Sequence, residues 1–305
     1  MEITLALGGG GIRGLAHIGV LRVLEREGFT IHSIAGTSAG GLIGAIYASG
    51  KSPDEMQAII TNLDQKKLFG RTKTDGPSLL GLSGLINLLT EVVGTKTFDD
   101  LRLPFACTAV DCISGQEVIL HHGSVLQAVT ATVAVPGVFP PVRIDNTNLI
   151  DGGVLDPVPV RPARWLAPHL PVVAVVLNPP APRTVLEPTM PIPIPGPQPL
   201  VEQFAKFRLA QAFNIFLRSN EISGLATTEL RLRVEKPDVI IRPMLVGIGL
   251  LDRVDPLKLI AAGERAAEEV LPQLRKAAGF TAKISRRTLQ VLKPKSNGTF
   301  RHDLR

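Results

Sequence analysis

Two glycine-rich turns, each between an apolar segment and a helical one, dominate the first 50 residues of this 305-residue chain. The first turn, at 8–14, follows the apolar segment 3–8, and the second, at 36–40, follows the apolar segment 31–36. Alternation of short strands with helices is typical of a parallel sheet that is covered by helices on both faces. The sequence therefore predicts an α/β fold.

The second turn, Gly36-Thr37-Ser38-Ala39-Gly40, has the spacing of a nucleophile elbow. An elbow holds its serine on a strained turn, and a Cβ on either glycine would collide with the neighbouring backbone. Because a bare match occurs by chance in a glycine-rich chain, the strand before it and the helix after it carry most of the weight. We therefore predict that Ser38 is the nucleophile of an acyl-transfer reaction.

The first turn, Gly9-Gly10-Gly11-Ile12-Arg13-Gly14, can supply backbone N–H groups to the oxyanion of such a reaction. The same spacing also fits a dinucleotide-binding loop, which is the competing interpretation. That loop requires an acidic residue at the end of the second strand, to bind ribose. Here that strand ends in the Ser38 turn, while Glu25 and Glu27 belong to the preceding helix, so acyl transfer is favoured.

The positions of the histidines argue against a histidine as the base that takes the serine proton. None of the six histidines follows a late strand, where an α/β-hydrolase triad places its imidazole, and only one strand precedes the elbow strand. A carboxylate is the alternative base, and Asp151 is the best candidate because Gly152 and Gly153 let the backbone turn tightly. Burial in an apolar pocket would raise the pKa of this carboxyl group enough for the task.

The glycine loop 9–14, the elbow 36–40 and the Asp151 turn, in this order, resemble the three signature motifs of the patatin-like phospholipase family. Further similarity lies in Ala16–Leu21 and Val135–Pro141, and the resemblance extends from residue 3 to about 275. It implies a three-layer α/β/α patatin-like fold with a mainly parallel central sheet. It also implies a Ser-Asp dyad that works without a metal or other cofactor.

The resemblance also assigns roles to individual residues. It makes Ser38 the nucleophile, Asp151 its general base, and the amides of Gly10 and Gly11 the oxyanion donors. It makes Arg13 the residue that orders the glycine loop. The sequence departs from the family pattern at Asp156, where relatives often carry Asn. The resemblance also places Gly9 and Gly14 among the residues that bind the oxyanion or the substrate. The glycines that support the motifs are Gly36, Gly40, Gly152 and Gly153.

Apolar periodicity and turn residues predict the other elements of the chain. The long helix expected over 200–233 has phenylalanines spread around its axis, so we expect it to be buried on several sides; a lid or a membrane contact is the alternative. The other expected elements are helices over 13–27, 39–49, 79–93, 125–133 and 256–278, a helix after Pro53, strands over 104–111, 116–120, 171–177 and 239–242, and short strands before Asp151.

The chain divides by composition into a body and a tail. Residues 1–279 are expected to form one acyl hydrolase domain, within which 179–199 contains nine prolines and is expected to cross the surface, where it could serve as a lid. Residues 280–305 hold seven Lys or Arg and one acid, and we expect a flexible, basic tail.

We expect a cytoplasmic hydrolase that acts on phospholipids or lysophospholipids, with peripheral contact to the inner membrane face. A lipid-binding or scaffold protein with weak or no turnover is the alternative function. Nucleic acid is not an expected partner, because one Trp and one Tyr offer few platforms for base stacking. No sequence feature indicates the oligomeric state or the preferred headgroup.

Overall fold

The computed structural model of the protein describes residues 1–62, 81–178, 198–249, 252 and 254–279. The proline-rich segment 179–199, expected as a possible lid, lies outside the described residues apart from 198–199. The basic tail 280–305, expected to be flexible, also lies outside them. None of the helices in the described ranges combines the length and the apolar character that a membrane span requires.

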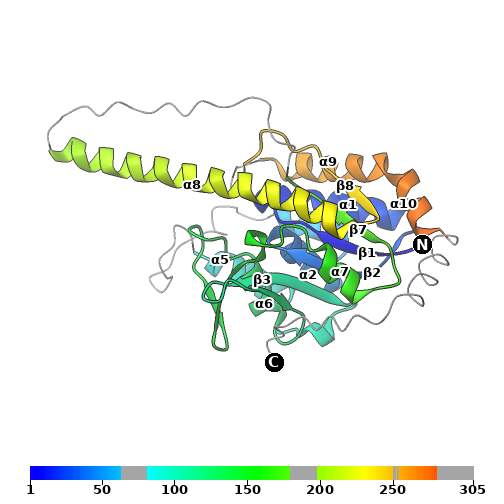
Figure 1. The fold of residues 1–305 in the computed structure, drawn as a ribbon. Coiled ribbons are helices and arrows are strands. Elements are labelled where there is room, and N and C mark those ends of the chain that lie inside the picture. Colours follow the sequence, from blue (N-terminus) through cyan, green and yellow to red (C-terminus); the bar gives the residue numbers. More distant parts are fainter. Residues whose placement is uncertain (63–80, 179–197, 250–251, 253, 280–305) are drawn as a thin grey trace.

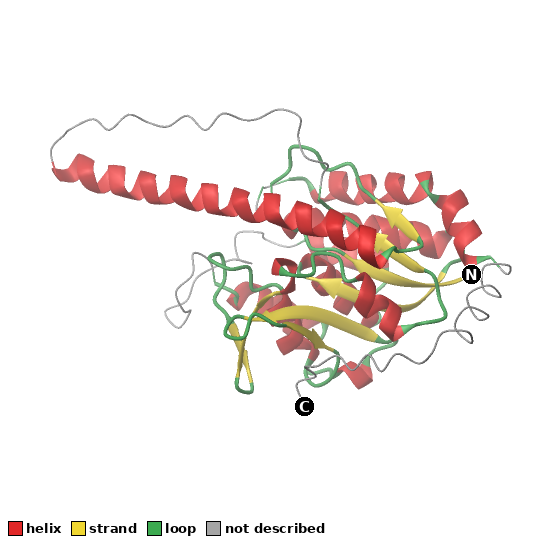
Figure 2. Ribbon diagram, viewed as in Figure 1, coloured by secondary structure: helices red, strands yellow, loops and turns green. Residues whose placement is uncertain are grey.

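A central sheet of eight strands organises the described part of the chain, in the order β5-β6-β3-β2-β1-β7-β8, with β4 also paired to β3 (Figures 1 and 2). The strands β1, β2, β3, β7 and β8 are mutually parallel, whereas β4 and β6 run antiparallel to β3. The strands are β1 (Glu2–Leu7), β2 (Thr30–Thr37), β3 (Phe105–Asp111), β4 (Glu117–Leu120), β5 (Val142–Ile144), β6 (Thr147–Asp151), β7 (Val172–Val175) and β8 (Val239–Ile241). The prediction of a mainly parallel α/β sheet is confirmed.

Helices cover both faces of this sheet, which makes three layers. Their bounds are α1 (Ala16–Arg26), α2 (Ala39–Ala48), α3 (Pro53–Thr61), α5 (Ser83–Val92), α6 (Val125–Thr132), α7 (Val160–Leu166), α8 (Gln198–Glu235), α9 (Pro256–Glu269) and α10 (Leu271–Ala278), with short 3-10 helices η1 (Gly11–Leu15), η2 (Phe98–Asp100) and η3 (Gly152–Val154).

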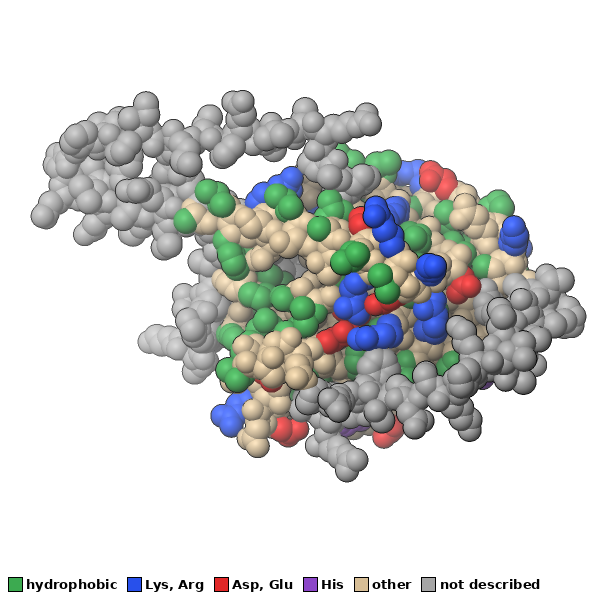
Figure 3. Space-filling view, viewed as in Figure 1, with side chains coloured by type: hydrophobic (Ala, Val, Ile, Leu, Met, Phe, Trp, Pro, Cys, Tyr) green, Lys and Arg blue, Asp and Glu red, His purple; other side chains and the backbone are tan. Residues whose placement is uncertain are grey.

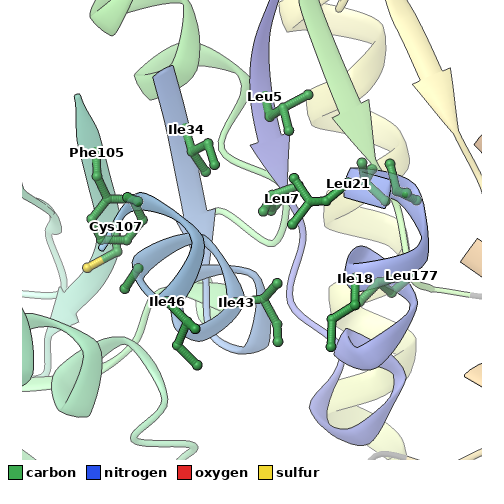
Figure 4. Close-up of a cluster of buried hydrophobic side chains, with 14 of the residues drawn as sticks. Leu5, Leu7, Ile18, Leu21, Ile34, Ile43, Ile46, Phe105, Cys107 and Leu177 are labelled. Atoms are coloured by element: carbon green, nitrogen blue, oxygen red, sulfur yellow. The ribbon is translucent and has the colours of Figure 1, made fainter. Parts of the chain in front are cut away.

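The layers follow from the alternation of side chains along each strand. Leu5 and Leu7 of β1 point into the larger core, where they pack with Ile18 of α1 and Ile43 of α2 (Figure 4). Ala6, between them, points to the opposite face and packs in a second, smaller core with α7. Small residues on that second face let α7 lie close to the sheet.

The structure differs from the predicted helices in two places. The segment expected as one helix over 256–278 is divided into α9 and α10, because Pro272 lies in the first turn of α10 and could not donate a backbone hydrogen bond inside a continuous helix. Helix α7 was not predicted at all, since Pro159 and Pro162 obscure its pattern. Both prolines lie where a helix tolerates them, before and within the first turn.

Helix α8 differs most from expectation. Its C-terminal part packs on the sheet, where Thr228 and Leu232 are buried, but its N-terminal part projects beyond the body (Figure 1). The prediction of burial on several sides is wrong for this part, because Ile215 and Phe216 are 55% and 43% exposed. The side chains of the other three phenylalanines used for that prediction, Phe204, Phe207 and Phe213, lie outside the described residues.

Candidate active site

The strained turn predicted for the nucleophile is present. Ser38 lies between the end of β2 and the start of α2 with φ 54° and ψ −123°, a conformation that L-residues rarely adopt. Its side chain is nearly buried, at 8% exposed. A turn of this kind presents the serine side chain beyond the end of the strand, where other loops can reach it.

The two glycines that flank the serine are required by close packing. A Cβ on Gly36 would lie 2.5 Å from the carbonyl oxygen of Gly40, and a Cβ on Gly40 would collide with the carbonyl group of Leu7. Both obstacles are backbone atoms, which cannot move aside without distorting the sheet or α2. The elbow therefore needs glycine at both positions.

Strand β3 brings the predicted base to the predicted nucleophile. Its residue Thr108 pairs with Thr37, and the next residue, Ala109, pairs with Asp151 at the end of β6. Ser38 directly follows Thr37, so the two side chains meet where β2 ends. The Asp151 carboxylate accepts a hydrogen bond from the Gly153 amide at 2.7 Å, and the Ser38 hydroxyl lies near enough to this carboxylate to lower its pKa.

The environment of Asp151 weakens its acidity. The residue is 4% exposed, and its burial raises the pKa of the carboxyl group to about 6, against the smaller opposing effects of the nearby Ser38 hydroxyl and of the hydrogen bond from Gly153. A Cβ on Gly152 would collide with Thr108, so glycine is needed for this turn to lie against β3. The carboxylate is thus a stronger base than a solvated aspartate, and it is held against the serine.

The glycine loop lies on the other side of Ser38. A Cβ on Gly9 would lie 3.1 Å from the Cβ of Ser38, so the loop passes within contact distance of the serine. The Gly9 amide donates to the Pro157 carbonyl at 2.9 Å. The amides of Gly10 and Gly11, in contrast, donate to no group within the described ranges, which leaves them able to bind an oxyanion.

Two further residues of the first motif have structural contacts. Gly14 lies against the first turn of α2, where a Cβ would come within 2.5 Å of the Cβ of Ala39. His17 is fully buried and its Nε2 lies 2.8 Å from the carbonyl oxygen of Gly8. Burial lowers the pKa of this imidazole to about 4, so it is neutral and supports the loop from behind.

Arg13 reaches away from the dyad. Its guanidinium group is 2% exposed and forms an ion pair of 2.5 Å with Glu221 of α8. The predicted role of Arg13 in ordering the glycine loop thereby acquires a partner that the sequence did not indicate. The ion pair joins the loop to the middle of α8.

Thr132, at the end of α6, is a site residue that sequence reasoning missed. Its hydroxyl accepts a hydrogen bond from the Ser38 amide at 2.9 Å and donates one to the Thr108 carbonyl at 2.6 Å. It thereby fixes the backbone of the elbow to β3. No motif marks this threonine in the sequence, because its contacts depend on where α6 packs.

Asp156, the residue at which relatives often carry Asn, is fully buried beside Arg231 of α8, with 3.0 Å between Oδ2 and the guanidinium group. Burial, together with the nearby carboxylates of Glu117 and Glu235, raises the pKa of Asp156, and Arg231 opposes that rise. The site therefore accommodates Asp at this position, with Arg231 as its partner.

No group of three Asp, Glu, His or Cys side chains in the described ranges is arranged to hold a metal ion. The chemistry that the arrangement itself offers is that of a hydroxyl nucleophile, a basic carboxylate and free backbone amides. These are the parts required for acyl transfer to serine.

Comparison with known proteins gives matches in the same region. The model of a family described as "Patatin-like phospholipase" matches residues 5–164, which include Ser38 and Asp151. An uncharacterized NTE family protein of Mycobacterium tuberculosis is 34% identical over 179 residues, which are 58% of this chain and 49% of that protein. The chain therefore spans about half the length of this relative.

Two other matches are more distant. A protein of Eremothecium gossypii named lysophospholipase NTE1 is 29% identical over 168 residues, 52% of this chain but 11% of that much longer protein. Among solved structures, VipD from Legionella pneumophila superposes with a TM-score of 0.54 at 14% identity, covering 90% of this chain and 67% of that one. The likeness to VipD concerns the fold.

Proposed function

Because the chain belongs to the patatin-like phospholipase family, we propose that it is a serine acyl ester hydrolase in which Ser38 and Asp151 form the catalytic dyad. The observation that carries the proposal is the juxtaposition, across β3, of a serine on a strained elbow and a buried carboxylate of raised pKa. Membership of the family implies lipid hydrolysis, and the dyad gives it a mechanism.

In this mechanism Asp151 removes the proton from the Ser38 hydroxyl as Oγ attacks the ester carbonyl carbon. The oxygen of the tetrahedral intermediate becomes negative and is stabilised by the amides of Gly10 and Gly11. The intermediate then collapses: the bond from carbon to the leaving oxygen breaks, and Asp151 gives its proton to the departing alcohol. An acyl group remains on Ser38.

Release of the acid repeats the same steps with water. Asp151, ionised again, takes a proton from a water molecule that attacks the acyl-serine carbonyl. Collapse of the second intermediate returns a proton to Ser38 and frees the fatty acid. One carboxylate can serve both half-reactions because a pKa of about 6 allows it to accept and to return a proton near neutral pH.

The substrates that we propose are phospholipids or lysophospholipids, for which one relative's name, lysophospholipase, is support. We further propose that residues 1–279 act as one domain, that the protein works in the cytoplasm against the inner membrane face, and that no cofactor takes part. A lipid-binding or scaffold protein without useful turnover is the alternative that an experiment must exclude.

Labelling with a fluorophosphonate, followed by intact-mass measurement, separates the two functions. The wild type should gain one adduct, Ser38→Ala should gain none, and Ser223→Ala, which changes an exposed serine of α8, should label as the wild type does. A panel of phospholipids, lysophospholipids and aryl esters then tests turnover by the wild type, Ser38→Ala and Asp151→Asn. Absence of labelling and turnover in the wild type would support the scaffold.

A further inference from the structure

Exposed apolar side chains gather at one edge of the sheet. The strands β1, β2, β3, β7 and β8 are parallel, so their carboxyl ends share an edge, and Ser38 lies there. Segments that leave this edge, or turn across it after Asp151, expose large apolar side chains to solvent. These are Ile113 (79% exposed) after β3, Val154 (49%) after Asp151, and Met244 (73%) and Val246 (65%) after β8.

Helix α8 adds two more apolar side chains at the same edge. Ile215 and Ile222 are 55% and 58% exposed and, seven residues apart, lie on the same side of the helix. The ion pair from Arg13 to Glu221 holds this stretch of α8 at the glycine loop. Hydrophobic side chains are visible beneath α8 toward the end of the body from which the helix projects (Figure 3).

We infer that this apolar rim, defined as Ile113, Val154, Ile215, Ile222, Met244 and Val246, docks on the surface of a phospholipid bilayer. The inference rests on the proposed function, because it supplies the partner from which Ser38 takes its substrate. The rim comes from four separate segments, and these leave or cross the sheet edge at which Ser38 lies, which is the edge that a lipid must reach. Contact of these tips with the acyl boundary removes apolar surface from water.

The described chain offers a control of matched exposure. Leu230 and Val234 are 63% and 72% exposed, close to the values for Val246 and Met244, but they lie near the end of α8 that leads to the amino end of β8. That is the opposite edge of the sheet. If exposure alone attracted the protein to lipid, both pairs would contribute equally.

Vesicle co-sedimentation of the full chain tests the docking directly. All proteins carry Ser38→Ala so that vesicles of phosphatidylcholine stay intact. We expect the parent to bind, the added pair Met244→Ser and Val246→Ser to weaken partitioning by roughly tenfold or more, and the pair Leu230→Ser and Val234→Ser to leave it unchanged. Equal loss in both pairs, or binding that high salt abolishes, would overturn the inference.

Activity and self-association give independent tests. In the wild-type background, Met244→Ser with Val246→Ser should reduce hydrolysis of vesicle phospholipid while leaving hydrolysis of a monomeric aryl ester unchanged. If the wild type turns over neither substrate, the proposed function fails while the sedimentation result still decides the docking. A dimer in sedimentation velocity that this pair converts to a monomer would instead assign the rim to a second copy of the chain.

Discussion

The hydroxyl of Ser38 lies near enough to the carboxylate of Asp151 to lower its pKa, although β2, which ends before Ser38, and β6, which ends at Asp151, are not neighbours in the sequence. Their meeting depends on β3, whose consecutive residues Thr108 and Ala109 pair with Thr37 and with Asp151. A shift of either strand by one residue would point the side chain concerned to the other face of the sheet. The register of β3 is therefore the structural basis of the proposed dyad.

Activity should depend on pH through Asp151. The ionised form is the base, and burial raises the pKa of this carboxyl group to about 6, so kcat/KM should fall as the pH decreases through about 6. A profile of kcat/KM from pH 4 to 9 on a monomeric aryl ester measures this. A rate that stays flat until the pH approaches 4 would contradict the assignment, since that is the profile expected of a free aspartate, whose pKa is about 3.9.

The same burial should make the ionised form of Asp151 lower the free energy of unfolding. The folded protein binds this proton more tightly than the unfolded chain does, so this group lowers the free energy of unfolding as the pH rises from about 4 to about 6. Asp151→Asn removes the charge and should be inactive yet more stable than wild type at pH 8, by on the order of 2 to 3 kcal/mol.

Urea unfolding of the two proteins at pH 8 and at pH 4 measures that difference. At pH 4 the wild-type carboxyl group is already mostly protonated, so the gain of Asp151→Asn should nearly vanish. A gain that is the same at both pH values would show that the effect comes from packing and not from charge.

Much of this site was predictable because local sequence determines it. The turn at Ser38 needs glycine at Gly36 and Gly40 whatever the rest of the chain does, since the collisions are with backbone of the same strand–turn–helix unit or of β1. The strands likewise follow from local pattern: β7 is buried along its whole length, as its uninterrupted apolar run predicts.

What could not be predicted depends on contacts between distant segments. Thr132 reaches the Ser38 amide only because α6 packs where it does, and Arg13 meets Glu221 only because α8 crosses the glycine loop. The projection of α8 was mispredicted for a related reason. Apolar residues around a helix axis do not reveal whether a partner surface extends far enough to cover them.

Thr132 should act on the reaction through the position of Ser38. Thr132→Val keeps the shape but leaves the Ser38 amide and the Thr108 carbonyl without their hydrogen bonds. We expect kcat to fall by about tenfold to a hundredfold with little change in KM, because the nucleophile is displaced while the binding surface is kept.

The conservative variant Thr132→Ser keeps the hydroxyl and should restore most of the activity. Steady-state kinetics of both variants, with circular dichroism to verify folding, make the comparison. An equal loss in Thr132→Ser, which keeps the hydroxyl, and in Thr132→Val, which removes it, would show that the hydroxyl is not what positions Ser38, and a rise in KM alone would place Thr132 at the substrate.

Two glycines should respond in opposite ways to the same methyl group. Gly40→Ala places a Cβ against the carbonyl group of Leu7 and should destabilise the fold by about 3 kcal/mol or more. Gly224, inside α8, has open space where a Cβ would be added, so Gly224→Ala should stabilise by about 0.5 to 1 kcal/mol through helix propensity. Thermal melts of both variants check the pair, and a Gly40→Ala protein that melts like wild type would refute the packing argument.

Glu221 should matter more to the fold than its exposure suggests, because its partner is buried. Glu221→Gln leaves the guanidinium group of Arg13, at 2% exposed, without its ion-pair partner, so that Asp252, which makes no ion pair with it, is the countercharge that remains; the change should destabilise the protein by about 1 to 3 kcal/mol. The matched control is Glu229→Gln on the same helix, whose ion pair with Arg242 is largely solvated and should contribute less than about 1 kcal/mol.

Because Arg13 joins the glycine loop to α8, loosening it should also disturb the amides of Gly10 and Gly11. We therefore expect Glu221→Gln to lower kcat by about tenfold on a monomeric ester, and Glu229→Gln to leave it unchanged. Urea unfolding and steady-state kinetics on the same two preparations decide the matter. If Glu221→Gln loses stability but keeps its full kcat, the ion pair anchors α8 without ordering the loop, and the oxyanion donors are held by the sheet alone.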